Sequence, residues 1–540
     1  MSDLNNFFSN KRIMTATSIP TEGKFRKGDI IVNIGPDADK DSMWICVEAG
    51  SPGVWKTIGE VDLSNYATKD DLEEAKQLGN NVKQGLTDAL IARGFPVSVN
   101  AEENTFDYLF NQLEAYASFA DRQSVYNVTV SAGQTLQLQN ATRGSYNLGI
   151  TNPNYIYTNW GDGVTDNKLS HTYSAAGTYT LATPYSFAYK NGVHDAASMN
   201  ALTGISTIRD TVNSMRHGFV NAYNLTSKPI CGANVTDMSL AYYHCTNMPG
   251  PAVCGNNVTN MSYAYEDCYK LTGSPVCGPK VTNMCGAYYD CTGLTGTPVC
   301  GANVTNMYAT YYNCTGITGA PVCGEKVTDM SHAYQYATSL TGAPVCGANV
   351  TNMAYAYEDC YLMSGTPVCG ANVTNMYAAY YNCGKLTQGT AVIGANVQDA
   401  SYAYWNCKTM NGIAPVASNK LTNISYAFYN CNKLVNIGNI GANVTNMAYA
   451  FYNCNVLTSG INVYVFSPNI TNAAYAFNGR NTNRYINFYV PANSTTLNTF
   501  IKNTAAESML GKAMVWNHNA SNKCYYNLTN GYRTRVFYTL

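Results

Sequence analysis

Residues 366–388 read TPVCGANVTNMYAAYYNCGKLTQ, and this unit recurs along the chain with a 23-residue step. The valine of its Asn-Val-Thr segment returns at matching positions from Val212 to Ile470, which gives twelve repeats between about residues 208 and 480. A unit of this length is too short to fold alone but long enough for one coil of a solenoid. The sequence therefore predicts a stacked repeat array over 208–480.

Within each coil we expect a short strand from Thr-Pro-Val-Cys-Gly, then a turn or short helix from Val-Thr-Asn-Met onward. Stacked strands lie about 4.8 Å apart, so the array would form a ridge of roughly 50–60 Å. The expected inward residues are the Val and Cys of the strand, the Val and Met after it, the Ala and second aromatic of Ala-Tyr-Tyr, the second Cys and the next Leu. The tyrosines expected to face outward and contact a ligand include Tyr242, Tyr288, Tyr311 and Tyr380.

This motif resembles the BspA-type, or Treponema-type, leucine-rich repeat, which carries a proline-containing strand, then V-x-x-I, A-F and C-x-x-L. Leu294, Ala309 and Cys314 are typical matches, and Phe428 and Phe451 restore the Ala-Phe pair of that family. Tyrosine in place of phenylalanine and cysteine in the strand are departures from it. The resemblance implies an extracellular or cell-surface binding array rather than an enzyme.

Sixteen of the nineteen cysteines lie in two repeat columns, and no Cys-x-x-Cys pair occurs, which argues against a structural zinc site. Neighbouring thiols of one column would be close enough for a disulfide but would point the same way. We predict buried free thiols that act as small apolar side chains, with disulfides as the alternative.

The recurring Asn-Val-Thr has the form of a glycosylation acceptor at Asn234, Asn303, Asn349, Asn372 and Asn443. Its strict period favours a turn in which the Asn and Thr side chains satisfy backbone groups. We therefore predict structural rather than glycosylated asparagines.

Charge and hydropathy exclude several classes of partner. Charged residues are 12% of the chain and the net charge is −1, so no basic field attracts nucleic acid. No run of about 18 apolar residues predicts membrane insertion, and the opening residues lack the apolar core of a secretory signal. The histidines are scattered away from nucleophiles, and the pairs Glu266-Asp267 and Glu358-Asp359 would have to face each other across a cleft to cleave glycosides. We expect no enzyme activity, no metal and no cofactor.

Residues 1–60 predict a separate small β unit with short strands joined by Gly/Pro turns. Its ICVEAGSPGVWK run resembles the N-terminal virion-attachment module of phage head and tail fibres. The resemblance implies that Trp44, Cys46, Pro52 and Trp55 anchor the chain to a capsid or tail protein.

Residues 61–93 predict a short trimeric coiled coil, because its seam positions alternate three and four apart: Leu72, Ala75, Gly79, Val82, Leu86 and Ala89, with the apolar side chains of all but Gly79 expected to trimerise. The segment also resembles coiled-coil starts of phage fibres, which implies a homotrimer. A lone amphipathic helix is the alternative. Residues 94–122 read as a linker with a short helix at about 103–117.

Residues 123–207 predict a β-sandwich, since TNWGDGVTDNKLSHTYSAAGTYTL resembles the PKD-like immunoglobulin-type fold. Trp160 and Tyr173 would lie in its core, and Asp162 would turn a hairpin, with a calcium ligand as the alternative. Residues 481–540 would cap the solenoid.

The predicted fold is multi-domain and mostly β: anchor, coiled coil, sandwich, solenoid and cap. That order suits a phage fibre subunit, assembled in the host cytoplasm into the virion, that binds host-surface glycan or protein through its repeats. A bacterial surface adhesin of the BspA type is the first alternative, and a polysaccharide depolymerase is the second.

Overall fold

The computed structural model describes residues 13–16, 21–22, 24, 30–33, 43–51, 54–58, 83–85, 87–88, 123–139, 158–184, 186–187, 189–190, 193–209, 212–386, 392–416, 418–458, 461–477, 485–491, 494–496, 499, 524–526 and 533–539. Its contacts divide the chain into two units, residues 1–112 and 113–540, and each is described by itself. Among the helices of these residues, none has the length and apolar character needed to cross a bilayer.

The first unit contains a four-stranded sheet in the order β1-β2-β3-β4. Its strands are β1 (Ile13–Ala16), β2 (Ile30–Asn33), β3 (Met43–Glu48) and β4 (Val54–Ile58). β1 pairs with β2 in parallel, and β2-β3-β4 is antiparallel. The short strands expected for this segment are therefore present. The six predicted seam positions and the helix expected at about 103–117 lie outside the described residues.

The second unit begins with two sheets of mainly short antiparallel strands. One has the order β14-β5-β10-β7-β8 and the other β11-β6-β9, with a separate β12-β13 pair and helix α5 (Ala196–Ala201) alongside. Tyr126, Leu136, Trp160 and Leu181 are fully buried in the core that these sheets share. The strands are β5 (Ser124–Val130), β6 (Thr135–Gln139), β7 (Thr158–Asn159), β8 (Thr165–Asp166), β9 (Ser170–Thr172), β10 (Gly177–Thr183), β11 (Ser186–Phe187), β12 (Tyr189–Lys190), β13 (Val193–His194) and β14 (Leu202–Thr207).

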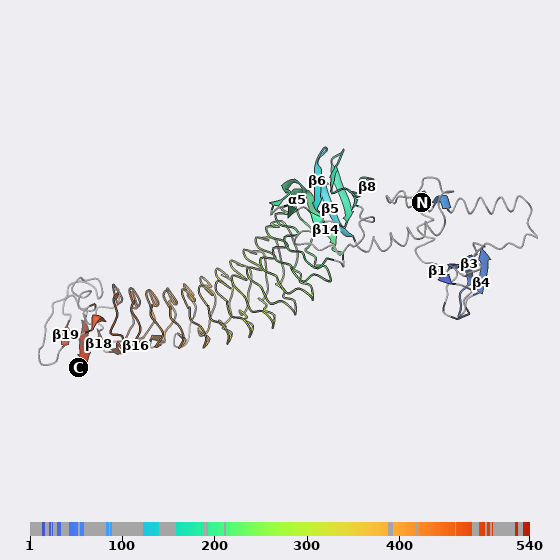
Figure 1. The fold of residues 1–540 in the computed structure, drawn as a ribbon. Helices are drawn as coiled ribbons and strands as arrows, with labels where there is room; N and C mark the ends of the chain where they lie inside the picture. The colour runs from blue at the N-terminus through green and yellow to red at the C-terminus, as the bar shows by residue number, and fades with distance from the viewer. Residues whose placement is uncertain are drawn as a thin grey trace, which may run out of the picture. The chain divides into compact units, whose positions relative to one another are not determined.

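Residues 212–477 form a solenoid whose coils stack one behind the next (Figure 1). In each coil the residue after the threonine of Asn-Val-Thr, or its equivalent, makes parallel β-bridges to the neighbouring coils. The column comprises Ser214, Asp237, Asn260, Asn283, Asn306, Asp329, Asn352, Asn375, Asp399, Asn423, Asn446 and Asn472. The predicted inward Val, Met, Ala, second Cys and Leu are fully buried, as the coil of Val281, Met284, Ala287, Cys291 and Leu294 illustrates.

The strand lies in a different part of the coil than the sequence suggested. Over the described residues 228–386, the Thr-Pro-Val-Cys-Gly segments contain no named strand, and the inter-coil bridge sits on Val-Thr-Asn-Met instead. Proline removes one backbone donor from the segment. A buried tyrosine supplies partners for the valine: Tyr311 Oη accepts from the Val299 N–H at 3.0 Å and donates to the Val299 carbonyl at 2.6 Å. The tyrosine hydroxyl thus makes the backbone hydrogen bonds that a neighbouring strand would otherwise make.

The same arrangement repeats in eight consecutive coils, in which each ring is stacked 5.3–5.6 Å from the next. These rings are Tyr242, Tyr265, Tyr288, Tyr311, Tyr334, Tyr357, Tyr380 and Tyr404. Phenylalanine occupies the column at both ends, at Phe219, Phe428, Phe451 and Phe477. At these ends the residue twelve positions earlier lies in or beside a strand, so its backbone has partners and no hydroxyl is needed.

The segment from methionine to the second cysteine is a ribbon of consecutive turns. Alternate residues, such as Met284 and Gly286, donate their backbone N–H to a carbonyl of the next coil. The N–H of Ala287 instead donates to the Met284 carbonyl and closes a turn within the coil. Two residues of this segment have positive φ in each coil, and the second is Asn or Asp in most coils, as at Asn313. Short polar side chains tolerate this left-handed conformation, which explains the residue type before the second cysteine.

Strands close both ends of the solenoid. β14 belongs to the five-stranded sheet that contains β5, and it leads into the first coil. There Phe219 packs edge-on against Tyr126 of β5, with the ring centroids 6.0 Å apart. The last coils contribute β15 (Ile413–Val416), β16 (Asn436–Ile440) and β17 (Ile461–Tyr464). β17 continues into a four-stranded sheet with β18 (Tyr485–Pro491), β20 (Arg533–Thr539) and β19 (Cys524–Tyr526). Open strand edges at the two ends are thereby paired.

Candidate ligand-binding surface

The four tyrosines predicted to contact a ligand are interior residues. Tyr242, Tyr288, Tyr311 and Tyr380 are 0% exposed, because each is the first aromatic of an Ala-Tyr-Tyr triplet, or of Thr-Tyr-Tyr at Tyr311, and belongs to the stacked inner column. The prediction reversed the two tyrosines of the triplet: the second one lies outside. A ribbon of turns has neither the period of a helix nor that of a strand, so the pattern could not distinguish them.

Two outer columns carry stacked, partly exposed aromatic side chains, while isolated tyrosines outside them, such as Tyr269 and Tyr361, are more exposed. The first is the residue after each buried ring, and the second is the left-handed residue two after the methionine. Between residues 381 and 475 each column carries four aromatic residues in consecutive coils. We call these eight rings the neutral strip: Tyr381, Trp405, Tyr429 and Tyr452 in the first column and Tyr402, Tyr426, Tyr449 and Tyr475 in the second.

Stacking orders the neutral strip. In the first column the ring centroids are 4.3, 5.6 and 4.7 Å apart, with interplanar angles of 4–9°. In the second column they are 4.6, 4.7 and 4.9 Å apart. Within a coil the two columns also touch, with Tyr426 5.9 Å from Tyr429 and Tyr449 5.7 Å from Tyr452. Because rings stack from coil to coil, their faces contact each other and their edges and hydroxyls point outward.

Stability alone does not account for the second column. A non-glycine residue in the left-handed region costs about 1–2 kcal/mol, and an aromatic pair contributes about 0.5–1.5 kcal/mol beyond its buried area. These terms nearly cancel at Tyr402 and Tyr426, whose φ is 57°. Other coils place Gly286 or Ala378 there, so the fold does not require an aromatic residue. The positive φ recurs at this position throughout the repeat, so the aromatic residues, and not the backbone conformation, distinguish the strip.

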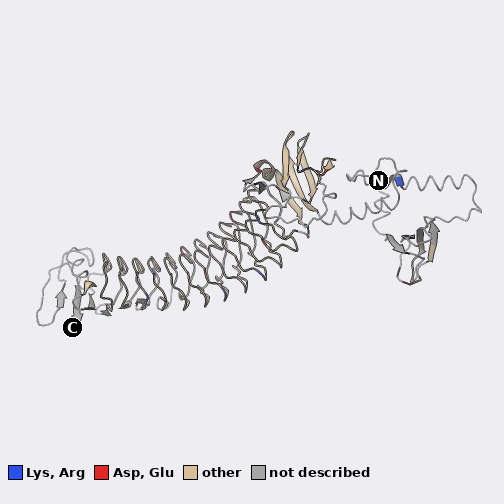
Figure 2. Cartoon of the chain, in the orientation of Figure 1, with Lys and Arg blue, Asp and Glu red and all other residues tan. Residues whose placement is uncertain are grey.

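An asparagine ladder runs between the first column and the buried cysteines. The Asn406 amide donates to Asn382 Oδ1 at 2.5 Å, Asn430 to Asn406 at 2.6 Å, and Asn453 to Asn430 at 2.7 Å. The segments 377–382, 401–406, 425–430 and 448–453 contain no Asp, Glu, Lys, Arg or His. These four segments are thus uncharged but rich in hydroxyl and amide groups, and few residues of these coils are coloured as charged (Figure 2).

The same columns are acidic nearer the N-terminus of the solenoid. Burial, and then the neighbouring Asp267 and Asp290, raises the pKa of Glu266 to about 7. Burial also raises the pKa of Glu358 to about 7, and the Gln335 amide donates to it at 2.5 Å. Asp267 pairs with His244 at 2.7 Å. These carboxylates are half-buried.

A second face carries the Asn-Val-Thr segments and contains an open groove. Its lining includes Thr305, Thr328, Thr351, Thr374, Asn349, Asn372, Lys326 and Lys420. The Thr328 hydroxyl donates to the Thr305 carbonyl at 3.2 Å, and the Asn349 amide donates to the Glu325 carbonyl at 2.8 Å. The asparagines of this motif therefore have the turn-and-ladder role predicted from their period. The residues that line this groove include no aromatic side chain.

The repeat cysteines are free thiols, as predicted. Those of the inner column are fully buried; Cys291 Sγ donates to the Tyr265 carbonyl at 2.9 Å. Burial raises the pKa of Cys291 well above its ordinary value, so the thiolate is disfavoured. The cysteines of the Thr-Pro-Val-Cys-Gly segments are only partly buried. Among the described residues, no group of three or more His, Cys, Asp or Glu side chains could hold a metal ion.

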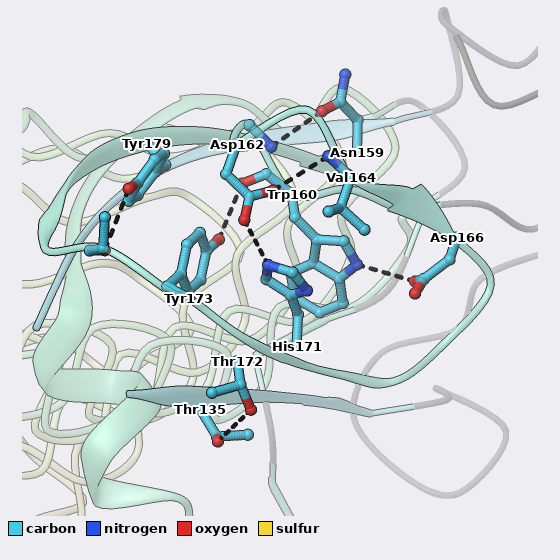
Figure 3. A network of polar contacts seen from close by, with 12 residues as sticks. Thr135, Asn159, Trp160, Asp162, Val164, Asp166, His171, Thr172, Tyr173 and Tyr179 are labelled. Carbon is cyan, nitrogen blue, oxygen red and sulfur yellow. Dashed lines mark hydrogen bonds and ion pairs between the residues drawn. The ribbon is translucent and has the colours of Figure 1, made fainter. Parts of the chain in front are cut away.

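The Trp-Gly-Asp-Gly segment of the two-sheet domain forms a polar network (Figure 3). Asp162 accepts from the Val164 N–H at 3.2 Å and contacts His171 Nε2 at 2.7 Å. The His171 ring stacks on Trp160 at 5.0 Å, and Tyr173 Oη donates to the Trp160 carbonyl at 2.9 Å. Trp160 and Tyr173 are core residues as predicted. Asp162 holds the turn, and these contacts occupy both of its carboxylate oxygens.

The residues proposed to anchor the N-terminal unit lie on one hairpin. Trp44 of β3 is opposite Thr57, and Cys46 is opposite Trp55 of β4. Cys46 is buried and Trp55 is partly exposed. Pro52 lies outside the described residues.

Comparison with known proteins finds leucine-rich repeat proteins. The family described as "Mycoplasma protein of unknown function, DUF285" matches residues 374–489 and, overlapping them, 422–532. A leucine rich cell surface protein of Faecalibacterium prausnitzii is similar at 18% identity and a TM-score of 0.29, over 50% of this chain and 76% of that one. A leucine-rich repeat protein of Bacteroides ovatus is similar at 13% identity and a TM-score of 0.30, over 58% and 94%. No curated protein matches the sequence.

Proposed function

We propose that this chain is a non-enzymatic recognition protein whose solenoid binds a host-surface glycan or protein. The neutral strip is the observation that carries the proposal. It gathers eight partly exposed aromatic residues on rigidly stacked coils, including four held in a left-handed backbone conformation that the fold does not require to be aromatic. Aromatic residues flanked by amides make large contacts at a low cost in side-chain entropy.

Within that class we propose a fibre subunit of a phage particle, located in the virion. The β3–β4 hairpin carries the residues that resemble a virion-attachment module, and it precedes the segment expected to trimerise. Capsid or tail protein would hold this end, while three solenoids would offer three copies of the strip. Trivalency raises a weak single-site affinity through effective concentration.

The solution mass of the full-length chain and of a chain lacking residues 1–93 tests this finer proposal. A trimer that becomes a monomer on truncation is expected. A monomeric full-length chain would refute the fibre and favour the first alternative, a bacterial surface adhesin that uses the same strip.

A polysaccharide depolymerase is the second alternative, and one observation favours it. Glu266 has the raised pKa of a general acid and lies near Asp267 and Asp290. Release of reducing ends from a polysaccharide, lost in Glu266→Gln, would support that alternative. Unchanged polysaccharide after long incubation is the result expected of a recognition protein.

A further inference from the structure

We infer that the neutral strip takes an extended, uncharged polysaccharide chain that lies along the solenoid axis. This inference rests on the proposed recognition function and names the ligand class of its surface. Three features of the strip lead to it: its lack of charge, the orientation of its rings, and its repeat.

The lack of charge comes first. The segments that form the strip contain no Asp, Glu, Lys, Arg or His, and burial raises the pKa of Tyr429 and Tyr426, which keeps these phenols neutral. The cations of these coils, Lys385, Lys408 and Lys433, lie outside the strip segments, so an anionic ligand would find no cation within the strip itself. A charged group transferred from water to this surface would lose hydration without an opposite partner, which is unfavourable. A neutral ligand is therefore favoured.

The ring orientation distinguishes among neutral and cationic ligands. Cations bind the negative faces of aromatic rings, but the faces of Trp405 and Tyr429 are covered by their stacked neighbours. The exposed edges carry the positive part of the ring quadrupole. They suit electron-rich hydroxyl and ether oxygens, and the phenol hydroxyls can both donate to and accept from a polyol. A polyhydroxylated chain matches such a surface better than an ammonium group does.

The repeat gives the direction of the ligand. Three consecutive coils offer the same set: one ring from each column and one amide of the asparagine ladder, as in Tyr426, Tyr429 and Asn430. Successive sets are separated by one coil, with ring spacings of 4.6–4.9 Å in the second column. A polymer of similar units laid along the axis would make the same contacts several times. A compact ligand would use only one or two coils.

The chain contains a matched control for the strip. Tyr289 and Tyr312 occupy the first column in earlier coils and stack at 4.2 Å with an interplanar angle of 5°. Their surroundings are acidic, since Asp290 follows Tyr289 in the chain. The Asn313 amide, next to Tyr312, donates to the Asp290 carboxylate at 2.6 Å. The two pairs share backbone position and stacking but differ in local charge.

The test is native gel electrophoresis of the full-length chain in gels containing laminarin, glucomannan or dextran, with alginate and polygalacturonate as acidic counterparts. Retardation by at least one neutral polymer and by neither acidic polymer is expected. The double variant Trp405→Ala, Tyr429→Ala should weaken binding about tenfold or more, whereas Tyr289→Ala, Tyr312→Ala should stay within about twofold of the wild type.

A gentler pair keeps the test independent of folding. Tyr429→Phe, Tyr452→Phe retains the stacked rings and removes two hydroxyls, so it should weaken binding while the thermal transition stays in place. Equal losses in the strip and control pairs, binding only to the acidic polymers, or no retardation by any neutral polymer would each overturn the inference.

A second measurement separates this inference from the proposed function: binding of the full-length chain to intact bacterial cells. The cells are those of the bacterium whose genome contains the gene, or of the host if the gene belongs to a phage. Cell binding that is lost in the strip variant but resists periodate oxidation of the cell surface would indicate a protein ligand, which refutes the glycan and leaves recognition standing. An absence of cell binding would refute the recognition function itself.

Discussion

Replacing one buried tyrosine by phenylalanine should reveal how the middle coils are held together. In Tyr311→Phe the ring keeps its stacking on Tyr288 and Tyr334, at 5.6 and 5.4 Å. Only the hydroxyl is lost, and with it both hydrogen bonds to the Val299 backbone. The variant therefore isolates the hydroxyl from the packing.

The expected loss follows from the two backbone groups left behind. Each buried polar group without a partner costs about 1–3 kcal/mol. Val299 is only partly buried, so water can replace part of what is lost. We expect a total of about 2 kcal/mol, which corresponds to a roughly thirtyfold change in a local opening equilibrium.

Native-state hydrogen exchange at the Val299 amide, together with urea unfolding, measures this effect. Tyr312→Phe is the control, because the same substitution one residue later changes a partly exposed side chain and should alter stability by no more than about 0.5 kcal/mol. Equal exchange rates at Val299 in the two variants would show that the hydroxyl is not the partner of this backbone, and the reasoning would fail.

Three further predictions concern ionisable groups. The pKa of Glu266 rises from 4.5 to about 7 on folding, so its contribution to stability is complete below pH 4.5 and is lost as the pH rises through 7. Glu266→Gln should therefore reduce the dependence of the unfolding free energy on pH between 4.5 and 7. An unchanged pH dependence would contradict the raised pKa. Thiol reagents should leave Cys291 and its inner-column equivalents unlabelled in the native chain, and mass spectrometry showing rapid labelling would contradict their burial. Asp162→Ala should destabilise the two-sheet domain by about 1–2 kcal/mol through the lost contacts to His171 and Val164; calorimetry on the wild type should show no effect of EDTA, since a shift would indicate a calcium ligand.

Much of the repeat could be predicted because its period fixes which residues share a column. Val281, Met284 and Cys291 are buried in the coil as their recurrence suggested. The location of the strand could not be predicted in this way. A Pro-Val-Cys segment is compatible with a strand by composition, and only the three-dimensional proximity of Tyr311 to Val299, twelve residues earlier, shows that a hydroxyl takes over its hydrogen bonds.

The binding surface was harder to predict than the fold. Two adjacent tyrosines such as Tyr288 and Tyr289 have the same composition and hydropathy, yet one is buried and the other is partly exposed. The division of the face into acidic and neutral parts was visible in the sequence once the outer columns were known. Glu266 and Trp405 occupy the same column in different coils.

The exchange of tyrosine for phenylalanine at the two ends has a consequence for how such a chain can change length. Between Tyr242 and Tyr404 each buried tyrosine stacks on the next ring and makes the same hydrogen bonds to the backbone twelve residues earlier, so a duplicated or deleted 23-residue unit would meet an interior of the same kind. At Phe219 and Phe428 the neighbours are strands in fixed register, and an inserted unit would not match them. Copy number in the middle can therefore set the reach of the array, while the phenylalanine-marked termini stay constant.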